Sequence, residues 1–394
     1  MSATSSERFE TVVIGGGQAG LAVGYYLAKQ DQSFVILDGG ERLGDPWRNR
    51  WDSLRVFTPA RYDGLPGWSF PAPGWSYPTK DEVADYLESY ATRFRLPVRS
   101  RTRVDGLWRE NDRYVVTSGL SRYSADNVVV ATGGYQTPRI PAFAAELDRE
   151  ILQLHSSQYR NPTQLRQGGV LVVGAGNSGA ELALEASADH QTWLSGRDTG
   201  QEPLRAGGLL DRFLTPPFWF LLSHVLTVRT PIGRKARDQL SNRGLPLARV
   251  RRRDLTRAGI ERLPRVTAVR DGLPLTADSR VHDVTNVIWC TGFVPDFHWI
   301  DLPVLDQDGE PKHTRGVVAS HPGLYFTGLF FLSTAASPLI GGTPRDARYI
   351  THHLAHRPKP ARTPQQPSTR RTDASAGPPP GLRRVVHPVV RKVF

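Results

Sequence analysis

Two short glycine-rich segments carry the clearest chemical pattern in the chain. The first is Gly15-x-Gly17-x-x-Gly20, which lies between an apolar β-rich run at Thr11–Ile14 and a helical pattern at Leu21–Lys29. In such a turn the first glycine permits the tight bend, the second lets the backbone approach a pyrophosphate, and the third lets helix and strand pack closely. Free N–H groups at the start of the helix then face the phosphates. The segment therefore predicts a dinucleotide-binding βαβ unit.

An acidic residue completes this first pattern. Asp38 ends a second strand at Ser33–Leu37, eighteen positions after the last glycine of the turn. A carboxylate at this place accepts hydrogen bonds from a ribose 2′-OH, which FAD carries without a phosphate. We therefore expect FAD here. The residues expected to bind it at this turn are Gly15, Gly17, Gln18, Ala19, Gly20 and Asp38.

The second glycine segment differs from the first at the position that reads the ribose. It lies within LVVGAGNSGAELA, between a strand at Val170–Val173 and a helix at Ala180–Ala188, and Arg197 stands eighteen positions after its last glycine. A guanidinium suits the 2′-phosphate of NADP, which an acid would repel. We expect NADPH rather than NADH, the alternative being that Arg197 is only an exposed charge. The residues expected to bind this nucleotide are Gly174, Gly176, Asn177, Ser178, Gly179 and Arg197.

The repetition of the strand–glycine turn–helix–strand order determines the expected fold. Two copies predict an α/β protein with two Rossmann-like dinucleotide-binding domains, each a mainly parallel sheet between helices in three layers. We expect a discontinuous FAD-binding domain of residues 8–160 and 283–356, with an NADPH-binding domain of residues 161–282 inserted into it. Residues 357–394 are rich in Pro, Arg and Ser, and we expect a disordered basic tail there.

The cysteine count limits the chemistry. Cys290 is the one cysteine of the chain, so an intrachain disulfide, a CxxC redox pair and a cysteine metal cage are all excluded. This removes the dithiol branch of the flavin disulfide reductases, and we expect no metal site. A reducing cytoplasm fits such a sequence.

The charge is concentrated near the C-terminus. Residues 357–394 hold nine Lys or Arg and one acid, so they carry +8 of the net +12 and leave +4 for the rest. A body so close to neutral argues against nucleic acid as a partner. We expect no secretory signal, because the first ten residues contain no apolar run. We expect no transmembrane segment, because the most apolar stretch, Phe213–Val228, is broken by Pro216-Pro217.

Several separated motifs resemble one family. The chain is similar, over residues 8–356, to the flavin-containing monooxygenase family in its broad sense, which includes Baeyer–Villiger, N-hydroxylating and plant indole-pyruvate monooxygenases. The motifs that carry the resemblance are GDPWRNRWDSLRVFTP at Gly44–Pro59, YPTKDEVADYLESYATRF at Tyr77–Phe94, VVVATGGY at Val128–Tyr135, LHSSQYRNP at Leu154–Pro162 and VIWCTGF at Val287–Phe293. The family's fingerprint keeps His155 and Tyr159, whereas Arg149 and Ile151 replace its Phe and Gly.

The resemblance implies a monooxygenase. In that family NADPH reduces FAD, O₂ adds at flavin C4a, and the resulting hydroperoxide transfers one oxygen atom to a small organic substrate. It also implies that Trp47, Arg48, Trp51 and Asp52 lie near the flavin, and that His155 lies in the segment that links the two domains. Of these, Trp47, Arg48, Asp52 and His155 are the expected catalytic residues. The alternatives are core packing for the tryptophans, surface charges for Arg48 and Asp52, and a structural hydrogen bond for His155.

Further cofactor-adjacent positions follow from the same resemblance. Two short segments resemble the hinges that return the chain between the domains, and one late strand resembles the strand whose glycine lies against the flavin pyrophosphate. These residues are Thr132, Gly133, Thr291, Gly292 and Gly328.

The substrate pocket is the least defined feature. Its candidate segments are residues 61–78, Leu209–Val228 and Phe330–Leu339, and the second of these reads either as a lid or as a buried helix pair. Two other functions stay open. One is an NADPH-dependent flavoprotein reductase or electron donor without oxygen transfer, and the other is a flavin-binding accessory protein of a transporter. Homo-oligomerisation also stays open.

Overall fold

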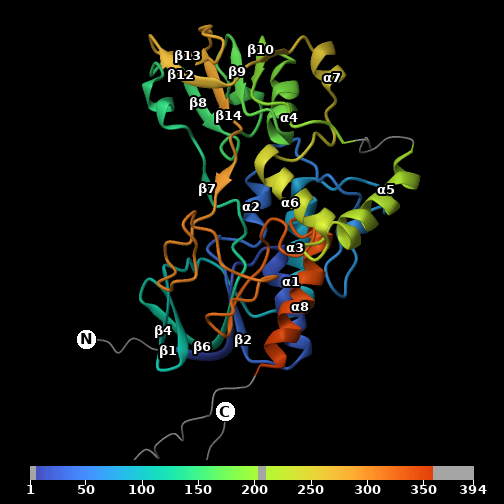
Figure 1. Ribbon diagram of the computed structural model, residues 1–394, viewed down its shortest axis with the longest axis vertical. Coiled ribbons are helices and arrows are strands. Elements are labelled where there is room, and N and C mark those ends of the chain that lie inside the picture. Colours follow the sequence, from blue (N-terminus) through green and yellow to red (C-terminus); the bar gives the residue numbers. More distant parts are fainter. Residues whose placement is uncertain (1–5, 203–209, 358–394) are drawn as a thin grey trace, which may run out of the picture. The chain divides into compact units, whose positions relative to one another are not determined.

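The computed structural model describes residues 6–202 and 210–357 (Figure 1). The predicted disordered tail at 357–394 falls, apart from its first residue, outside the described residues. Within the part of the chain that is described, no helix is long and apolar enough to cross a lipid bilayer.

The first sheet has seven strands and is built around two long neighbours, β1 and β6. Its order is β3-β2-β1-β6-β5-β4, with β16 also paired to β6. Strands β1, β2, β3, β6 and β16 are parallel, whereas β4 and β5 extend the sheet antiparallel. The bounds are β1 Ser6–Ile14, β2 Phe34–Leu37, β3 Val98–Arg99, β4 Gly106–Glu110, β5 Arg113–Ser118, β6 Ser121–Val130 and β16 Leu324–Phe326.

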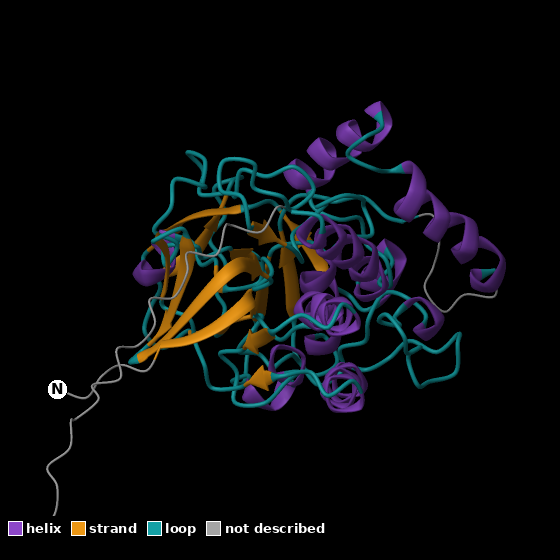
Figure 2. Cartoon of the chain, turned by 90° about the horizontal axis from the view of Figure 1, so that it is seen from below, coloured by secondary structure: helices purple, strands orange, loops and turns teal. Residues whose placement is uncertain are grey.

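Burial explains the composition of the central strands. Parallel strands that are covered on both faces read as continuous apolar runs, and β2, with the sequence FVIL, is buried at all four residues. Helix α1 (Gln18–Lys29) packs against α3 (Lys80–Arg93) and α8 (Thr343–Ala355). Figure 2 shows helices gathered along one side of the strands. Helix α3 buries its apolar face, and Thr79 begins it with a capping box to Glu82.

The second sheet is entirely parallel, with the order β11-β10-β9-β14-β8. Helix α4 (Asn177–Ala186) follows β9 directly, and a β-hairpin, β12–β13, lies between β11 and β14 in the chain. The bounds are β8 Leu152–His155, β9 Val170–Val173, β10 Thr192–Ser195, β11 Glu261–Leu263, β12 Val266–Arg270, β13 Leu273–Thr276 and β14 Asn286–Trp289. The two sheets, each with its own glycine turn, give the predicted α/β fold with two Rossmann-like units.

The chain leaves the first sheet and returns to it through one pair of short strands. Strand β7 (Thr137–Pro138) pairs antiparallel with β15 (Phe293–Val294), and Figure 1 shows this pair between the two sheets. The division into domains stays a prediction. Because β8 and β14 lie outside residues 161–282 yet pair with the second sheet, we propose that the boundaries follow the sheets and fall at the β7–β15 pair.

A helical segment separates β10 from β11 in the chain. It contains α5 (Asp211–Phe220), a π-helical turn η4 (Leu221–Val225), α6 (Pro231–Arg243) and α7 (Arg252–Arg257). The remaining elements are short: α2 Asp45–Arg48, η1 Ala60–Tyr62, η2 Ala142–Glu146, η3 Pro162–Gln164 and η5 Ile340–Gly342.

Candidate cofactor and substrate sites

The first glycine turn has the geometry that a dinucleotide needs. Gly15 has φ +109°, and a Cβ there would lie 2.6 Å from the carbonyl oxygen of Ala131. A Cβ on Gly20 would overlap the carbonyl oxygen of Gly15, so only glycine lets α1 approach the turn. Gly17 has no heavy atom near its missing Cβ, and no side chain caps α1. The first N–H groups of α1 therefore face open space, where a pyrophosphate fits.

Asp38 lies at the end of β2, against this turn. Its Oδ2 accepts a hydrogen bond of 2.6 Å from the N–H of Gly16, and its Oδ1 accepts one of 2.9 Å from the N–H of Gly40. These bonds fix the carboxylate beside the glycine loop. A carboxylate oxygen accepts more than one hydrogen bond, so Asp38 keeps capacity for a ribose hydroxyl.

Small residues from three elements meet next to α1. A Cβ on Gly328, just after β16, would lie 3.0 Å from the Cβ of Ala19 in α1, and Gly133 is the next nearest residue. Gly133 and Gly328 both have positive φ, at +69° and +73°. The neighbouring Thr327 has a buried hydroxyl without a partner among the described residues. The backbones thus leave a path for an extended cofactor, which fits FAD.

The second turn repeats the first almost atom for atom. Gly174 has φ +110°, and a Cβ there would overlap the carbonyl oxygen of Cys290. A Cβ on Gly179 would overlap the carbonyl oxygen of Gly174, whereas Gly176 has open space. Helix α4 also begins without a side-chain cap. The side chain of Asn177 is committed to a loop, since its Nδ2 donates to the carbonyl oxygen of Pro246 and its Oδ1 accepts from the N–H of Ala248.

The end of β10 gathers positive charge around Arg197, which is exposed. Asp198 pairs with Arg252 of α7 at 2.5 Å, and the Arg262 guanidinium lies 3.4 Å from the carbonyl oxygen of Gly196. A backbone N–H bond from Gly200, with Arg252 and Arg262 nearby, holds the pKa of Asp198 below its usual range. One acid among three arginines leaves the site cationic, as a 2′-phosphate requires. Sequence reasoning missed Arg252 and Arg262 because they are distant in the chain.

The segment at residues 47–52 is bound to its surroundings by its charged side chains. Arg48 donates to Asp85 at 2.9 Å and to Glu88 at 3.1 Å, both in α3, and also to the carbonyl oxygen of Leu43. Because the Arg48 guanidinium is hydrogen-bonded to two acidic side chains of α3, a role at the flavin loses support. We propose a structural role for Arg48.

Asp52 is engaged by the segment that follows β8. Its Oδ2 accepts a hydrogen bond of 2.7 Å from Asn161, and its N–H donates to the carbonyl oxygen of Arg160 at 2.8 Å. Asp52 therefore ties its segment to the linker after β8. Its side chain is more than half exposed, and its predicted catalytic role likewise loses support.

The two tryptophans of this segment pack in the core. Trp51 is 4% exposed and belongs to the apolar cluster of the second sheet, together with Tyr159 and Val172. Trp47 is half-buried and packs against the clusters of both sheets. Core packing, one of the two expectations for these side chains, is therefore present, and contact with the flavin stays a proposal.

His155 ends β8 and joins it to the return segment. Its Nε2 lies 3.0 Å from the carbonyl oxygen of Gly292, so Nε2 carries the proton, and its Nδ1 accepts from the Ser157 N–H at 3.2 Å. Burial lowers the pKa of His155, the bond to Gly292 opposes this, and Arg50 adds to the lowering. The ring is therefore a neutral, fully bonded group that positions Gly292.

Arg50 is a functional candidate that the sequence did not single out. Its guanidinium lies 5.0 Å from the ring centre of Phe293 and 5.7 Å from that of Tyr135. Phe293 in turn contacts the His155 ring edge-on at 4.9 Å. Burial lowers the pKa of Arg50, and no ion pair to an acid is present for it among the described residues. A half-buried cation thus lies beside the aromatic residues that follow Gly133 and Gly292.

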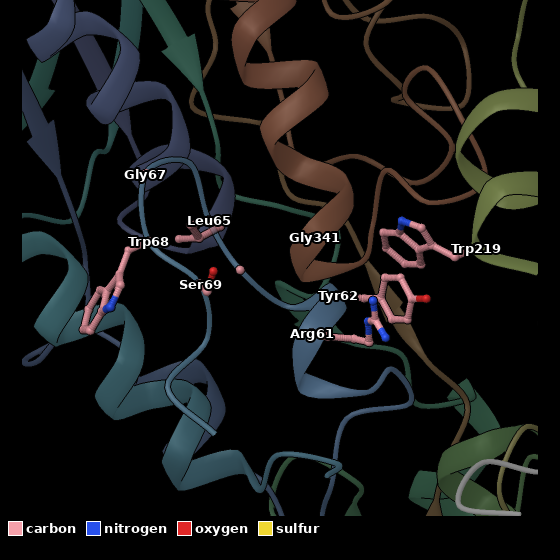
Figure 3. A pocket seen from close by; sticks show the side chains of 9 residues that line it. Arg61, Tyr62, Leu65, Gly67, Trp68, Ser69, Trp219 and Gly341 are labelled. Atoms are coloured by element: carbon pink, nitrogen blue, oxygen red, sulfur yellow. The ribbon is translucent and has the colours of Figure 1, made fainter. Parts of the chain in front are cut away.

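One cavity of about 490 Å³ adjoins the loop at residues 61–69. Figure 3 shows Arg61, Tyr62 and Trp219 grouped on one side of it, with the Trp68 side chain on the other. The Tyr62 and Trp219 rings lie 5.0 Å apart. Two of the three predicted substrate segments, 61–78 and 209–228, thus meet here, and Gly341 lies shortly after the third.

A buried carboxyl stands beside this cavity. Asp63 is between two lining residues in the chain and is 0% exposed. Thr58 donates to its Oδ1 at 2.5 Å, whereas its Oδ2 has no partner among the described residues. Burial raises the pKa of Asp63 to about 7, and the bond from Thr58 opposes this. In the described part of the chain, no cluster of His, Cys, Asp and Glu is able to hold a metal ion.

Comparisons with known proteins agree with this geometry. Residues 12–203 match the Pyridine nucleotide-disulphide oxidoreductase family. An uncharacterised CzcO-like oxidoreductase of Geobacillus kaustophilus is 42% identical over 88% of this chain and 98% of its own. The probable indole-3-pyruvate monooxygenase YUCCA3 of Arabidopsis thaliana is 27% identical over 88% of this chain and 86% of its own. A flavin-containing monooxygenase of Stenotrophomonas maltophilia superposes with a TM-score of 0.69, at 28% identity, over 89% of this chain and 98% of its own.

Fold, glycine turns and relatives together define a flavoprotein oxidoreductase with two dinucleotide-binding units. The chain belongs to the flavin-containing monooxygenase family in its broad sense. FAD and NADPH are the cofactors of this family, and the two turns fit them. The name of the matched family refers to a disulphide, but this chain has a single cysteine, whose pKa is raised by burial, and so it has no intrachain dithiol pair.

Proposed function

We propose that the protein is an FAD- and NADPH-dependent monooxygenase that inserts one oxygen atom from O₂ into a small organic substrate. The observation that carries the proposal is the cavity at the 61–69 loop, Trp219 and Gly341. An electron donor to another protein needs no pocket for an organic molecule, whereas a monooxygenase does. A volume of about 490 Å³ suits a small molecule.

On the FAD side, the proposed work of the protein is to hold and orient. The N–H groups at the start of α1 bind the pyrophosphate, Gly17 leaves room for it, and Asp38 accepts from the ribose hydroxyls. Gly133 and Gly328 let the backbone lie close to the cofactor. Thr132 and Trp47 are proposed to border it.

On the NADPH side, the second glycine turn and the start of α4 are proposed to bind a different nucleotide. Gly176, Ser178 and the N–H groups of α4 bind its pyrophosphate, and Arg197 binds the 2′-phosphate. When bound, NADPH and FAD supply the hydride transfer and the activation of O₂. Asn177 shapes the site through its bonds to the loop at residues 246–248.

The hinge residues are proposed to set the relative position of the two nucleotides. His155 holds the carbonyl of Gly292, and Thr291 donates to the carbonyl oxygen of Arg139 in the outgoing segment. Arg50, whose guanidinium lies beside the Tyr135 and Phe293 rings, is proposed to face an anionic part of a cofactor, because a half-buried cation is stabilised by compensating charge or aromatic faces.

The proposal is tested by measuring how NADPH oxidation is divided between product and hydrogen peroxide. Purified protein is supplied with FAD, NADPH and O₂, and a panel of small ketones, amines and thioethers is screened for oxygenated product. We expect at least one compound to raise NADPH consumption and lower the peroxide yield. Trp219→Ala should lower this coupling, and Leu120→Ala, on the exposed β5–β6 turn, is the matched control.

If the hydrogen peroxide yield equals NADPH consumption and no compound in the panel lowers it, the proposal is contradicted. The alternative of a flavoprotein reductase without oxygen transfer would then be favoured. A protein that binds FAD but oxidises NADPH hardly at all would favour the accessory role. A cytoplasmic location is proposed on the single cysteine alone.

A further inference from the structure

Helix α5 and the turn η4 present their apolar side chains to solvent. Phe213 is 76% exposed, Leu210 65% and Phe220 58%, and Leu214 and Leu221 are also exposed. At 3.6 residues per turn these five positions fall on one face of a single helical stripe. Scattered surface apolar residues are ordinary, but a contiguous stripe of large ones marks a binding surface. The expectation of a buried helix pair in this segment is therefore wrong for its described residues.

The opposite face of the same segment is polar and buried. Asp211, Thr215 and Ser223 are each 8% exposed. Asp211 accepts hydrogen bonds from Thr215 and from Tyr77 of the cavity loop, and Arg345 donates to the carbonyl oxygen of Ser223.

These contacts fix which face points outward. Trp219 stacks on Tyr62 at 5.0 Å and lies against Gly341, so the helix cannot turn its apolar stripe inward without breaking the cavity wall. The polarity of the segment is thus the reverse of an ordinary surface helix, which buries its apolar face. In Figure 1, α5 lies at the edge of the molecule.

The exposed charge that accompanies the stripe is mostly positive. Between residues 210 and 241 the chain holds two acids, Asp211, which is buried, and Asp238, which lies 3.6 Å from Arg237. Ile232, at the start of α6, adds a further apolar side chain that is 59% exposed. The exposed cations of this stretch are Arg212, Arg229, Arg234, Lys235 and Arg237.

We infer that the outward face of α5–η4 docks on an anionic lipid surface, with the stripe in the interface and the cations of α6 toward the headgroups. A protein surface that exposes large apolar side chains together with arginine and lysine binds anionic lipid through both. A second copy of the chain would place cations against cations. The chain's own tail is excluded for the same reason, since residues 357–394 carry +8.

The experiment measures binding of the full-length, FAD-loaded protein to sedimented vesicles. Vesicles of phosphatidylcholine alone are compared with vesicles containing about one third phosphatidylglycerol. We expect binding to the anionic vesicles that weakens with salt, and at least about a tenfold loss of binding in Phe213→Ser/Phe220→Ser, since both rings leave water on docking. Arg234→Glu/Lys235→Glu should lose binding to the anionic vesicles selectively.

Leu120→Ser is the matched control, because Leu120 is 92% exposed but lies in the β5–β6 turn of the first sheet. It should bind as the unchanged protein does. Retained FAD and unchanged NADPH oxidation in the double phenylalanine variant show that it has folded, and they do not depend on any organic substrate. The inference is overturned if the wild-type protein does not bind anionic vesicles, or if the double phenylalanine variant binds them as well as wild type does. If the wild-type protein is a dimer and the double variant is a monomer, the stripe contacts a second copy of the chain instead, and the inference is overturned.

Discussion

The two glycine turns use one backbone geometry for two different nucleotides. Gly15 and Gly174 have φ of +109° and +110°, and in each turn the third glycine lies against the carbonyl of the first. In each, the middle glycine is open to solvent and the helix begins without a side-chain cap. Both ligands contain a pyrophosphate, and both turns offer it the same glycine-rich backbone and helix N-terminus.

The turns differ where their ligands differ. Asp38 is held by the N–H groups of Gly16 and Gly40, so its negative charge is fixed beside the ribose position. Arg197 is exposed and has Arg252 and Arg262 in its neighbourhood through Asp198 and Gly196. The comparison teaches that the backbone shape of the turn makes it suitable for a dinucleotide. The side chain at the end of the second strand then determines whether the ribose hydroxyl or its 2′-phosphate is favoured.

The largest effect is expected from the third glycine of each turn. Gly20→Ala places a Cβ on the carbonyl of Gly15, and Gly179→Ala does the same at Gly174. Each should destabilise its unit by roughly 3 kcal/mol, because overpacking cannot relax against backbone. Thermal unfolding of the FAD-free protein measures this.

The matched controls are Gly17→Ala and Gly176→Ala, whose Cβ atoms meet nothing. They should leave the FAD-free protein as stable as before and weaken only the binding of FAD and NADPH, respectively. Equal destabilisation by all four substitutions would contradict the proposed difference between the third and the middle glycine of each turn.

A second contrast concerns one buried carboxyl in each half, Asp63 and Glu181. Burial raises the pKa of each to about 7, and Arg249, at 3.7 Å, opposes this only for Glu181. A carboxyl whose folded pKa exceeds its unfolded value binds its proton more tightly in the folded state, so its stabilisation is lost as pH rises. Between pH 5 and 8 the loss at Asp63 should be roughly 2 kcal/mol.

Asp63→Asn should therefore flatten the fall of Tm between pH 5 and 8. Glu181→Gln should also flatten it, because glutamine does not titrate. Arg249 loses a carboxylate partner only above about pH 7, where Glu181 is ionised, so any lowering of Tm by this substitution should appear there. Parallel pH curves for wild type and Asp63→Asn would show that Asp63 is ionised throughout this range.

Arg197 tests the difference between the turns directly. Arg197→Ala should raise the KM for NADPH about 10-fold to 100-fold and leave the KM for NADH nearly unchanged, since a charge-assisted bond to phosphate contributes about 1.5–3 kcal/mol. Steady-state rates with each nucleotide give the ratio. An equal loss with both nucleotides would mean that Arg197 supports the fold of the site and not its selectivity.

The smallest effect is expected at Arg252. It is more than half exposed and pairs with Asp198, and screened surface charges act weakly. Arg252→Ala should raise the KM for NADPH about twofold to threefold, and added salt should abolish the difference. A change as large as that of Arg197→Ala would mean that Arg252 binds the phosphate itself.

The parts of the site that sequence could predict are those that depend on local backbone. Both glycine turns, the strands before them and the capped helix α3 follow from residues close together in the chain. The three predicted substrate segments were also informative, since two of them meet at the cavity. The roles of Arg48 and Asp52 were not predictable, because their partners Glu88 and Asn161 are 40 and 109 residues away.

The sequence by itself thus determined the fold class, the family and the difference between Asp38 and Arg197, because glycine conformation and charge are properties of single residues. Only the tertiary structure decided that Arg50 lies beside the Tyr135 and Phe293 rings, and that Asp63 is buried. It also decided which face of α5 points outward, since Tyr77 and Tyr62 hold its polar side. Periodicity shows that a helix has an apolar face, but burial depends on what the rest of the chain places against it.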